Sequence, residues 1–243
     1  MPTSAVPTDE PDGSDPETET EDVEGDVDDL PRPPASGGGV RIAQRGHATG
    51  RLPRMDVIAG IDAARERWNV LEHPFYTRWE QGELTRDELA RYAGEYRHAV
   101  VALARAARTA RLHADEEAQH IALWDDFAST LGTETSEPLP QTRCCASAWA
   151  AADDELGAAA ILYAIEAGQP AISETKLRGL LDHYGFSGDS PAVEYFAVHG
   201  ELDHEHAAEA RTKLATADDE RLVQLAESAL AANWALLDGV SQN

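Results

Sequence analysis

The chain has 243 residues with a formal net charge of −25, and 42% of its residues are hydrophobic, which is enough for one sizeable core. Such an acidic balance argues against nucleic-acid binding, which needs a basic surface. The sequence has no apolar run long enough to span a bilayer, and its acidic N-terminus is unlike a signal peptide, so we expect a soluble cytoplasmic protein.

Residues 1–53 form a polar, acidic segment that we expect to be a disordered tail. The first thirty residues contain no Lys or Arg, and the stretch 9–29 is dominated by Asp, Glu, Thr, Pro and Gly, which cannot bury apolar surface. The tail either serves as a solubilising or interaction segment or is an unconstrained extension. The sequence therefore predicts one folded domain over residues 54–243.

The first half of this domain shows apolar residues at helical spacing. A helix is predicted over 56–72, and no alternating strand pattern is visible. Thr85 and Glu88 form a capping box that begins a helix running towards Leu112. The next boundary stays open, because residues 113–116 can continue this helix or begin another.

The second half is also helical. Gly132 ends the preceding helix, and a proline-rich link leads to a long Ala-rich stretch that ends around Glu166. A helix follows over about 173–184, and Ser190-Pro191 begins the next one. A last helix is capped by residues 216–219. The pattern predicts an all-α bundle of about seven or eight helices.

The most informative motif is H-x-x-x-D-x-x-H, formed by His199, Asp203 and His206. In a helix these three residues share one face over two turns. Phe196 and Leu202 flank the stripe, which indicates that the helix packs inward. Two imidazoles and a carboxylate on one stripe are typical ligands of a first-row transition metal.

Two further segments supply ligands of the same kinds. Glu117 and His120 have the E-x-x-H spacing that carboxylate-bridged di-iron bundles use, although Glu116 can also share a face with His120. Glu166 ends an apolar run, and a buried carboxylate needs a cation, a hydrogen-bond network or a metal. The three segments together would provide three carboxylates and three histidines for two metals.

These motifs resemble a known family over about residues 57–237. The opening motifs His73-Pro-Phe-Tyr76, Trp79 and Gly82-Glu-Leu-Thr85 are similar to those of the TenA/PqqC superfamily, which has a haem-oxygenase-like fold. The later motifs are similar to the CADD-like branch of haem-oxygenase-like di-iron oxidases and oxygenases: Leu162-Tyr-Ala-Ile-Glu166, Gln169-Pro170, Glu174-Thr-Lys176 and the H-x-x-x-D-x-x-H motif.

The resemblance implies a site and an activity. The six implied iron ligands are Glu117, His120, Glu166, His199, Asp203 and His206. They would hold two Fe ions that activate O2 to oxidise a small organic molecule. In the CADD-like branch a tyrosine and a lysine take part in making p-aminobenzoate, and the tyrosine is consumed; Tyr76 and Lys176 lie in the matching contexts. Proteins of this fold often form homodimers.

The sequence departs from the branch at two points. Residues 102–112 connect the Tyr92-Tyr96 helix to the first metal cluster, and this segment is shorter than usual for the branch. The sequence therefore leaves open which residue is the first ligand and whether the site holds one metal or two. Ile165 replaces a tyrosine expected just before the third carboxylate.

Two alternatives remain open at this point. On the same fold, TenA-like thiaminases use a cysteine nucleophile, for which Cys144 or Cys145 is available, and PqqC-like oxidases need no metal. Neither chemistry explains the H-x-x-x-D-x-x-H motif. Adjacent cysteines rarely pair, so no disulfide is expected. A third alternative is a non-catalytic regulatory or binding protein.

Overall fold

The computed structural model describes residues 55–135 and 137–242, and within these ranges the chain is helical and contains no β-strand. The predicted all-α fold is confirmed, whereas the predicted tail over residues 1–53 lies outside the described residues. The elements are α1 (Val57–Arg67), the 3-10 helix η2 (Val70–Glu72), α2 (Pro74–Glu80), α3 (Arg86–Ala110), α4 (Ala114–Leu131), α5 (Pro140–Trp149), α6 (Glu155–Glu166), α7 (Gln169–Asp182), α8 (Pro191–Leu214) and α9 (Glu220–Ser241).

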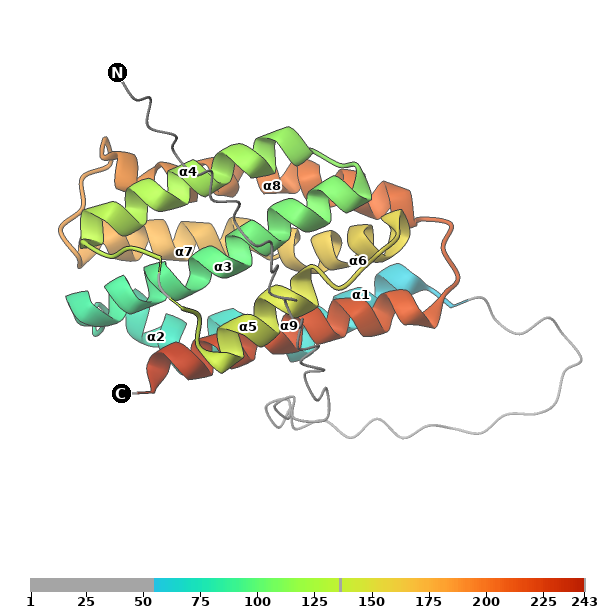
Figure 1. Ribbon diagram of the computed structural model, residues 1–243, viewed down its shortest axis with the longest axis horizontal. Helices are drawn as coiled ribbons and strands as arrows, with labels where there is room; N and C mark the ends of the chain where they lie inside the picture. Colours follow the sequence, from blue (N-terminus) through green and yellow to red (C-terminus); the bar gives the residue numbers. More distant parts are fainter. Residues whose placement is uncertain (1–54, 136, 243) are drawn as a thin grey trace, which may run out of the picture.

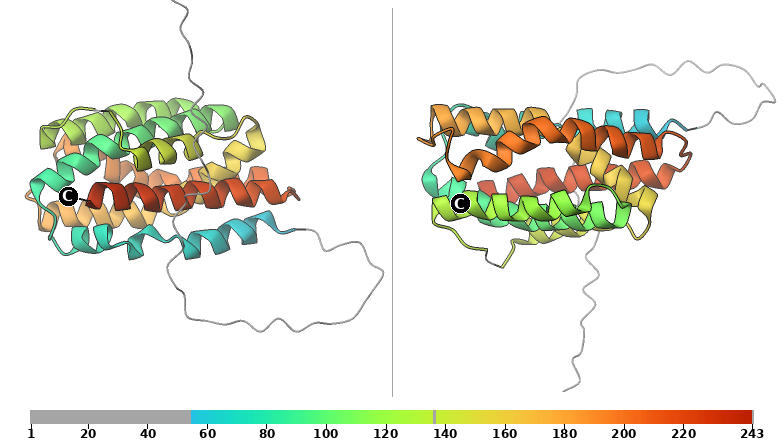
Figure 2. Two further views of the ribbon diagram at one scale, coloured as in Figure 1. Left: turned by 60° about the horizontal axis from the view of Figure 1, so that its bottom comes forward. Right: turned by 90° about the horizontal axis from the view of Figure 1, so that it is seen from above.

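The long helices run roughly side by side in an elongated bundle (Figure 1). Helix α4 packs against α3 and α8, and α8 also packs against α6 and α7. On the opposite side of the bundle, α9 lies between α1 and α5 (Figure 2). Side chains on the inner faces of α4, α6 and α8 therefore meet in one region of the interior.

Several predicted helix boundaries are confirmed. Thr85 and Glu88 form the expected capping box at the start of α3. The side chain of Ser190 accepts a hydrogen bond at the start of α8, with Pro191 in the first turn. Gly132 ends α4 in the left-handed conformation, at φ 75°. These local signals fix the start of α3, the end of α4 and the start of α8.

Other boundaries differ from the sequence prediction. The Ala-rich stretch divides into α5 and α6, because the Asp154 carboxylate accepts hydrogen bonds from the backbone N–H groups of Leu156 and Gly157 and so begins a new helix. Helix α7 begins at Gln169 rather than Ser173. No helix in the described ranges combines the length and the apolar character that a bilayer-spanning segment requires.

Candidate metal centre

Helix α4 carries a buried carboxylate and a buried imidazole at the predicted E-x-x-H spacing. The Oε1 atom of Glu117 lies 3.1 Å from Nδ1 of His120. Both side chains are buried. Burial by itself would raise the pKa of the Glu117 carboxyl, but the hydrogen bond from His120 and the nearby His206 imidazole outweigh it and hold that pKa well below its usual range. Glu117 is therefore an ionised carboxylate in the interior.

Glu116 and Glu117 are clearly distinguished by the structure. Glu117 is 1% exposed, whereas the side chain of Glu116 is 55% exposed and meets the far nitrogen of His206, with Oε2 3.0 Å from Nε2. A proton held on Nε2 by Glu116 leaves Nδ1 of His206 free to bind a metal. Nδ1 is buried and faces the Oε1 atom of Glu117 at 3.5 Å.

Helix α8 turns the whole H-x-x-x-D-x-x-H motif inward, as the spacing predicts. His199, Asp203 and His206 are all buried. Nδ1 of His199 lies 2.6 Å from the carbonyl oxygen of Tyr195, which fixes the tautomer and leaves Nε2 with its lone pair. Oδ1 of Asp203 lies 3.5 Å from Nδ1 of His206.

Glu166, at the end of α6, meets a histidine that the sequence analysis did not include among the ligands. Oε1 of Glu166 lies 2.8 Å from Nε2 of His113, which precedes α4. Burial raises the pKa of the Glu166 carboxyl to about 7. His113 lies seven residues before His120. This spacing places two residues on one face only within a continuous helix. Because His113 lies at the boundary of α4, the spacing alone does not relate it to His120.

The side chains form two neighbouring groups that share Glu117. In the first group, ligand atoms of His113, Glu117, Glu166 and His206 all lie within 4.8 Å of one another. In the second, those of Glu117, His120 and His199 do. Five of the six predicted ligands thus fall into these groups, and Asp203 lies beside the first one.

The chemistry of these side chains fits divalent metal binding. Several of their polar atoms are buried and have no hydrogen-bond partner among the described residues: Nε2 of His199, Nδ1 of His206, both carboxylate oxygens of Asp203 and Oε2 of Glu166. Such atoms are costly to bury without a partner, and a metal ion would satisfy them. Imidazoles and carboxylates together suit iron.

The side chain of Lys176 lies next to this centre, in an aromatic box formed by the rings of Tyr76, Tyr92, Tyr96, Trp124 and Phe196. The Nζ atom of Lys176 is 5.1 Å from the centre of the Tyr76 ring and 4.8 Å from that of Tyr96. Burial lowers the pKa of Lys176 to about 7, so a large share of this amine is neutral near neutral pH. The hydroxyl groups of Tyr76 and Tyr92 are 2.9 Å apart.

Two aromatic rings connect the box to the metal ligands. The Trp124 ring lies 5.9 Å from Nζ of Lys176 and 4.8 Å from the Tyr195 ring. The Tyr195 ring in turn stacks on His199, with ring centres 3.9 Å apart. The lysine and tyrosine that the sequence singled out therefore share one buried region with the histidine motif.

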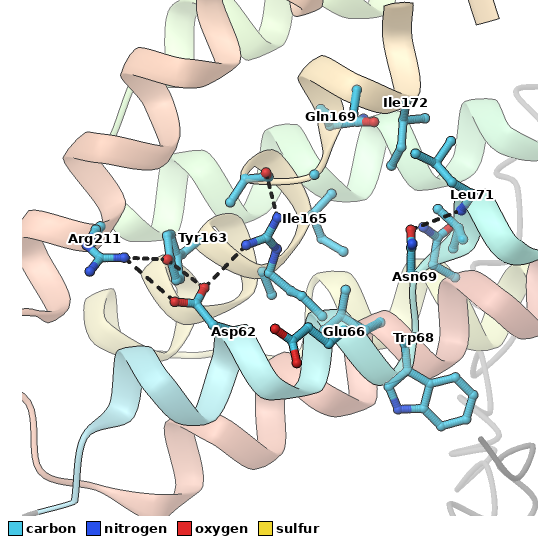
Figure 3. Close-up of a pocket in the computed structure, with 18 residues that line it drawn as sticks. Asp62, Glu66, Trp68, Asn69, Leu71, Tyr163, Ile165, Gln169, Ile172 and Arg211 are labelled. Carbon is cyan, nitrogen blue, oxygen red and sulfur yellow. Dashed lines mark hydrogen bonds and ion pairs between the residues drawn. The ribbon is translucent and has the colours of Figure 1, made fainter. Parts of the chain in front are cut away.

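A separate half-open pocket with a volume of about 640 Å³ lies between α1 and the α6–α7 turn (Figure 3). Arg65 and Arg211 both line this pocket, and both approach the Asp62 carboxylate, at 3.3 Å and 3.7 Å. Arg65 also donates a hydrogen bond to the carbonyl oxygen of Ala167, directly after Glu166. This contact holds the turn that positions the Glu166 carboxylate, but the pocket walls contain none of the metal-group residues.

The cysteines lie on α5, outside both groups. Cys145 is fully buried, and burial raises the pKa of its thiol well above the usual range. Cys144 is exposed. A buried, protonated thiol is a poor nucleophile, so the structure does not favour Cys145 in the thiaminase alternative.

Comparison with known families agrees with this arrangement. The sequence profile of the iron-containing redox enzymes matches residues 91–239, which is more than half of the chain. The chain belongs to the iron-containing redox enzyme family. This protein is accordingly an iron-dependent oxidoreductase, and the resemblance stated from the motifs is confirmed.

Curated relatives carry a more specific name. A protein of Chlamydia muridarum named 4-aminobenzoate synthase is 27% identical over 212 residues, covering 76% of this chain and 89% of that protein. Proteins of the same name from Nitrosomonas europaea and Chlamydia pneumoniae are 28% and 31% identical, over 75% and 64% of this chain and 90% and 80% of their own lengths.

Solved structures have the same fold as this chain. A TenA homologue from Pseudomonas syringae superposes with a TM-score of 0.64 at 14% identity, covering 82% of this chain and 100% of the other. A domain with a haem-oxygenase-like fold from Shewanella denitrificans gives a TM-score of 0.63 at 19% identity, covering 77% and 92%. The predicted haem-oxygenase-like fold is confirmed.

Proposed function

We propose that this protein is a non-haem di-iron oxidase or oxygenase that uses O2 as co-substrate to oxidise a small organic molecule. The observation that carries the proposal is the pair of ligand groups that share the buried Glu117 carboxylate. A carboxylate common to two sets of imidazoles is the arrangement that di-iron carboxylate proteins use. Membership in the iron-containing redox enzyme family supports iron as the metal.

Different residues would hold the two ions of this centre. His120 and His199, with Glu117, would hold one ion, and His206, Glu166 and Glu117 would hold the other, with Asp203 beside them. Two bound ferrous ions would supply electrons for the reduction of O2. Burial of these side chains keeps bulk water from the reaction. Glu116 and the Tyr195 carbonyl oxygen orient two of the imidazoles.

The finer proposal is formation of 4-aminobenzoate, with Tyr76 consumed and Lys176 as a catalytic residue. The relatives named 4-aminobenzoate synthase support it, as does the close approach of the two side chains. The five rings around Nζ stabilise the ammonium form through their faces, while burial favours the neutral amine. A neutral amine at this position is able to act as a nucleophile or a base.

The test loads the purified protein anaerobically with ferrous iron, adds O2, and measures O2 consumption and released 4-aminobenzoate. We expect iron-dependent consumption of O2, which the His199→Ala variant should lose. The control variant His204→Ala, which changes an exposed residue of the same helix, should still consume O2. Absence of consumption by the iron-loaded protein would contradict the oxidase proposal.

The finer proposal is tested in the same samples by mass spectrometry of residue 76. We expect loss of the Tyr76 side chain together with 4-aminobenzoate, neither of which occurs in Tyr76→Phe. Tyr184→Phe, which changes a half-buried tyrosine that hydrogen-bonds to the backbone of Leu84, serves as the control. O2 consumption with an intact Tyr76 would contradict only the finer proposal.

A further inference from the structure

His113 occupies a turn that no capping hydrogen bond from its side chain stabilises. It precedes α4 in the N-cap position with φ 32° and ψ 33°, in the left-handed region, and its side chain makes no capping hydrogen bond. Arg111, two residues earlier, also has a positive φ, of 56°. Left-handed backbone is unfavourable at a residue other than glycine and persists where the surroundings determine it. The position of the imidazole is a candidate for what determines this turn.

The His113 imidazole points into the first ligand group. Its side chain is 4% exposed, and Nε2 lies 2.8 Å from Oε1 of Glu166. The ring also stacks on that of His206, with ring centres 3.7 Å apart and planes at 2°. The turn between α3 and α4 thus brings a fourth buried histidine to the two groups formed by the described residues.

The two stacked histidines have matching surroundings. The far nitrogen of His206 meets Glu116, which follows His113 by three residues. The far nitrogen of His113, Nδ1, faces Oε2 of Glu209 at 3.9 Å, and Glu209 follows His206 by three residues. Each ring therefore has a partly exposed carboxylate on its outer side, supplied by the helix of the other ring. The Glu116 carboxylate is within hydrogen-bond distance of the His206 ring and is of the kind that typically orients a metal-bound histidine, whereas the Glu209 carboxylate lies beyond that distance from the His113 ring.

We propose that His113 is a metal ligand through Nε2, so that the first site consists of His113, His206, Glu166 and the shared Glu117. This inference rests on the proposed di-iron function. The six ligands predicted from the sequence do not include His113, and the centre then has four histidines rather than three. Binding through Nε2 leaves the proton on Nδ1, towards Glu209.

The test uses Co(II) as a paramagnetic probe in the full-length protein. The N–H proton of each histidine bound to Co(II) gives a strongly shifted NMR signal that disappears in D2O. We expect four such signals from the wild-type protein loaded with two Co(II) ions and three from His113→Gly. The glycine suits a positive φ, and circular dichroism verifies the fold of the variant. His204→Gly is the matched control on α8 and should keep all four signals.

Titrations of Co(II) monitored by visible absorption give a second measurement. We expect His113→Gly to weaken binding of one of the two ions by roughly tenfold or more, and added imidazole to restore the affinity and the fourth signal. Three signals from the wild-type protein, or two ions bound at wild-type affinity by His113→Gly, would overturn the inference but leave the di-iron proposal intact. A wild-type protein that binds no Co(II) would overturn both.

Discussion

Glu116 and Glu117 are adjacent in the sequence but meet opposite nitrogens of the same imidazole. Oε2 of Glu116 lies 3.0 Å from Nε2 of His206, on the outer side, and Oε1 of Glu117 lies 3.5 Å from Nδ1, on the inner side. Successive residues on a helix point about 100° apart, so the two carboxylates can reach around one ring. Their roles in metal binding should therefore differ.

Glu116→Gln should weaken metal binding without changing the number of ions. The amide can still contact His206, but it loses the negative charge that stabilises the Nε2 proton, and loss of such an outer carboxylate typically costs about 10–100-fold in affinity. Glu117→Gln should reduce the number of ions bound, because both ligand groups contain Glu117. Titration with Fe(II) or Co(II) measures both quantities. Equal effects of the two variants would contradict the assignment of Glu117 as the shared ligand.

Lys176→Met should stabilise the protein at neutral pH. Burial lowers the pKa of Lys176 from 10.5 to about 7, and at about 1.4 kcal/mol per pKa unit the buried ammonium costs roughly 5 kcal/mol below pH 7. Between pH 7 and 10.5 the unfolded chain binds more protons at this lysine than the folded chain, so wild-type stability rises with pH. The advantage of Lys176→Met should shrink over that window.

Chemical denaturation of the metal-free protein between pH 6.5 and about pH 9.5 measures this effect. Lys213→Met is the control, because Lys213 is paired with Glu155, with Nζ 2.8 Å from Oε2, near the surface. Lys213→Met should show no stabilisation that declines with pH. A difference between Lys176→Met and the wild type that stays constant with pH would argue against a buried amine of lowered pKa.

Two glycine substitutions should have opposite effects on stability. A Cβ atom added at Gly179 in α7 would lie 2.6 Å from Cδ1 of Trp79, a fully buried ring that cannot move aside. Gly179→Ala should therefore destabilise the fold by about 1–3 kcal/mol. Nothing lies within 4 Å of a Cβ atom added at Gly200 in α8, so Gly200→Ala should stabilise the fold by about 0.5–1 kcal/mol.

Denaturation of both variants by urea at one pH tests this pair. Trp79 also donates a hydrogen bond to the carbonyl oxygen of Lys176, so displacement of Trp79 should disturb the aromatic box as well. Equal stabilities of the two variants would show that α7 can move away from Trp79 without cost.

Most residues of the candidate centre can be placed on inward-facing helix surfaces from the sequence, because they lie within regular helices. The H-x-x-x-D-x-x-H motif and the Glu117-x-x-His120 pair have spacings that put their members on one helix face, and the structure buries all of them. Glu166 was predicted from the cost of a carboxylate at the end of an apolar run, and it is buried. Local sequence carries this information without any knowledge of the packing.

The parts that were not predictable depend on contacts between helices. The E-x-x-H spacing favours Glu117 over Glu116, but the contact of Glu116 with His206, ninety residues away in the sequence, depends on how α4 packs against α8. The sequence does not predict that His113 lies near His120, because the left-handed turn at His113 breaks the helical spacing that would relate the two residues. The division of the Ala-rich stretch depends on the capping residue Asp154, which the Ala-rich composition concealed.

Anomalous diffraction at the iron edge, from anaerobic crystals of the ferrous protein, would test the proposed di-iron centre around Glu117. We expect two iron positions, on either side of the Glu117 carboxylate. One would contact His120 and His199, and the other Glu166 and His206. A single iron position, or iron bound away from these side chains, would contradict this proposal.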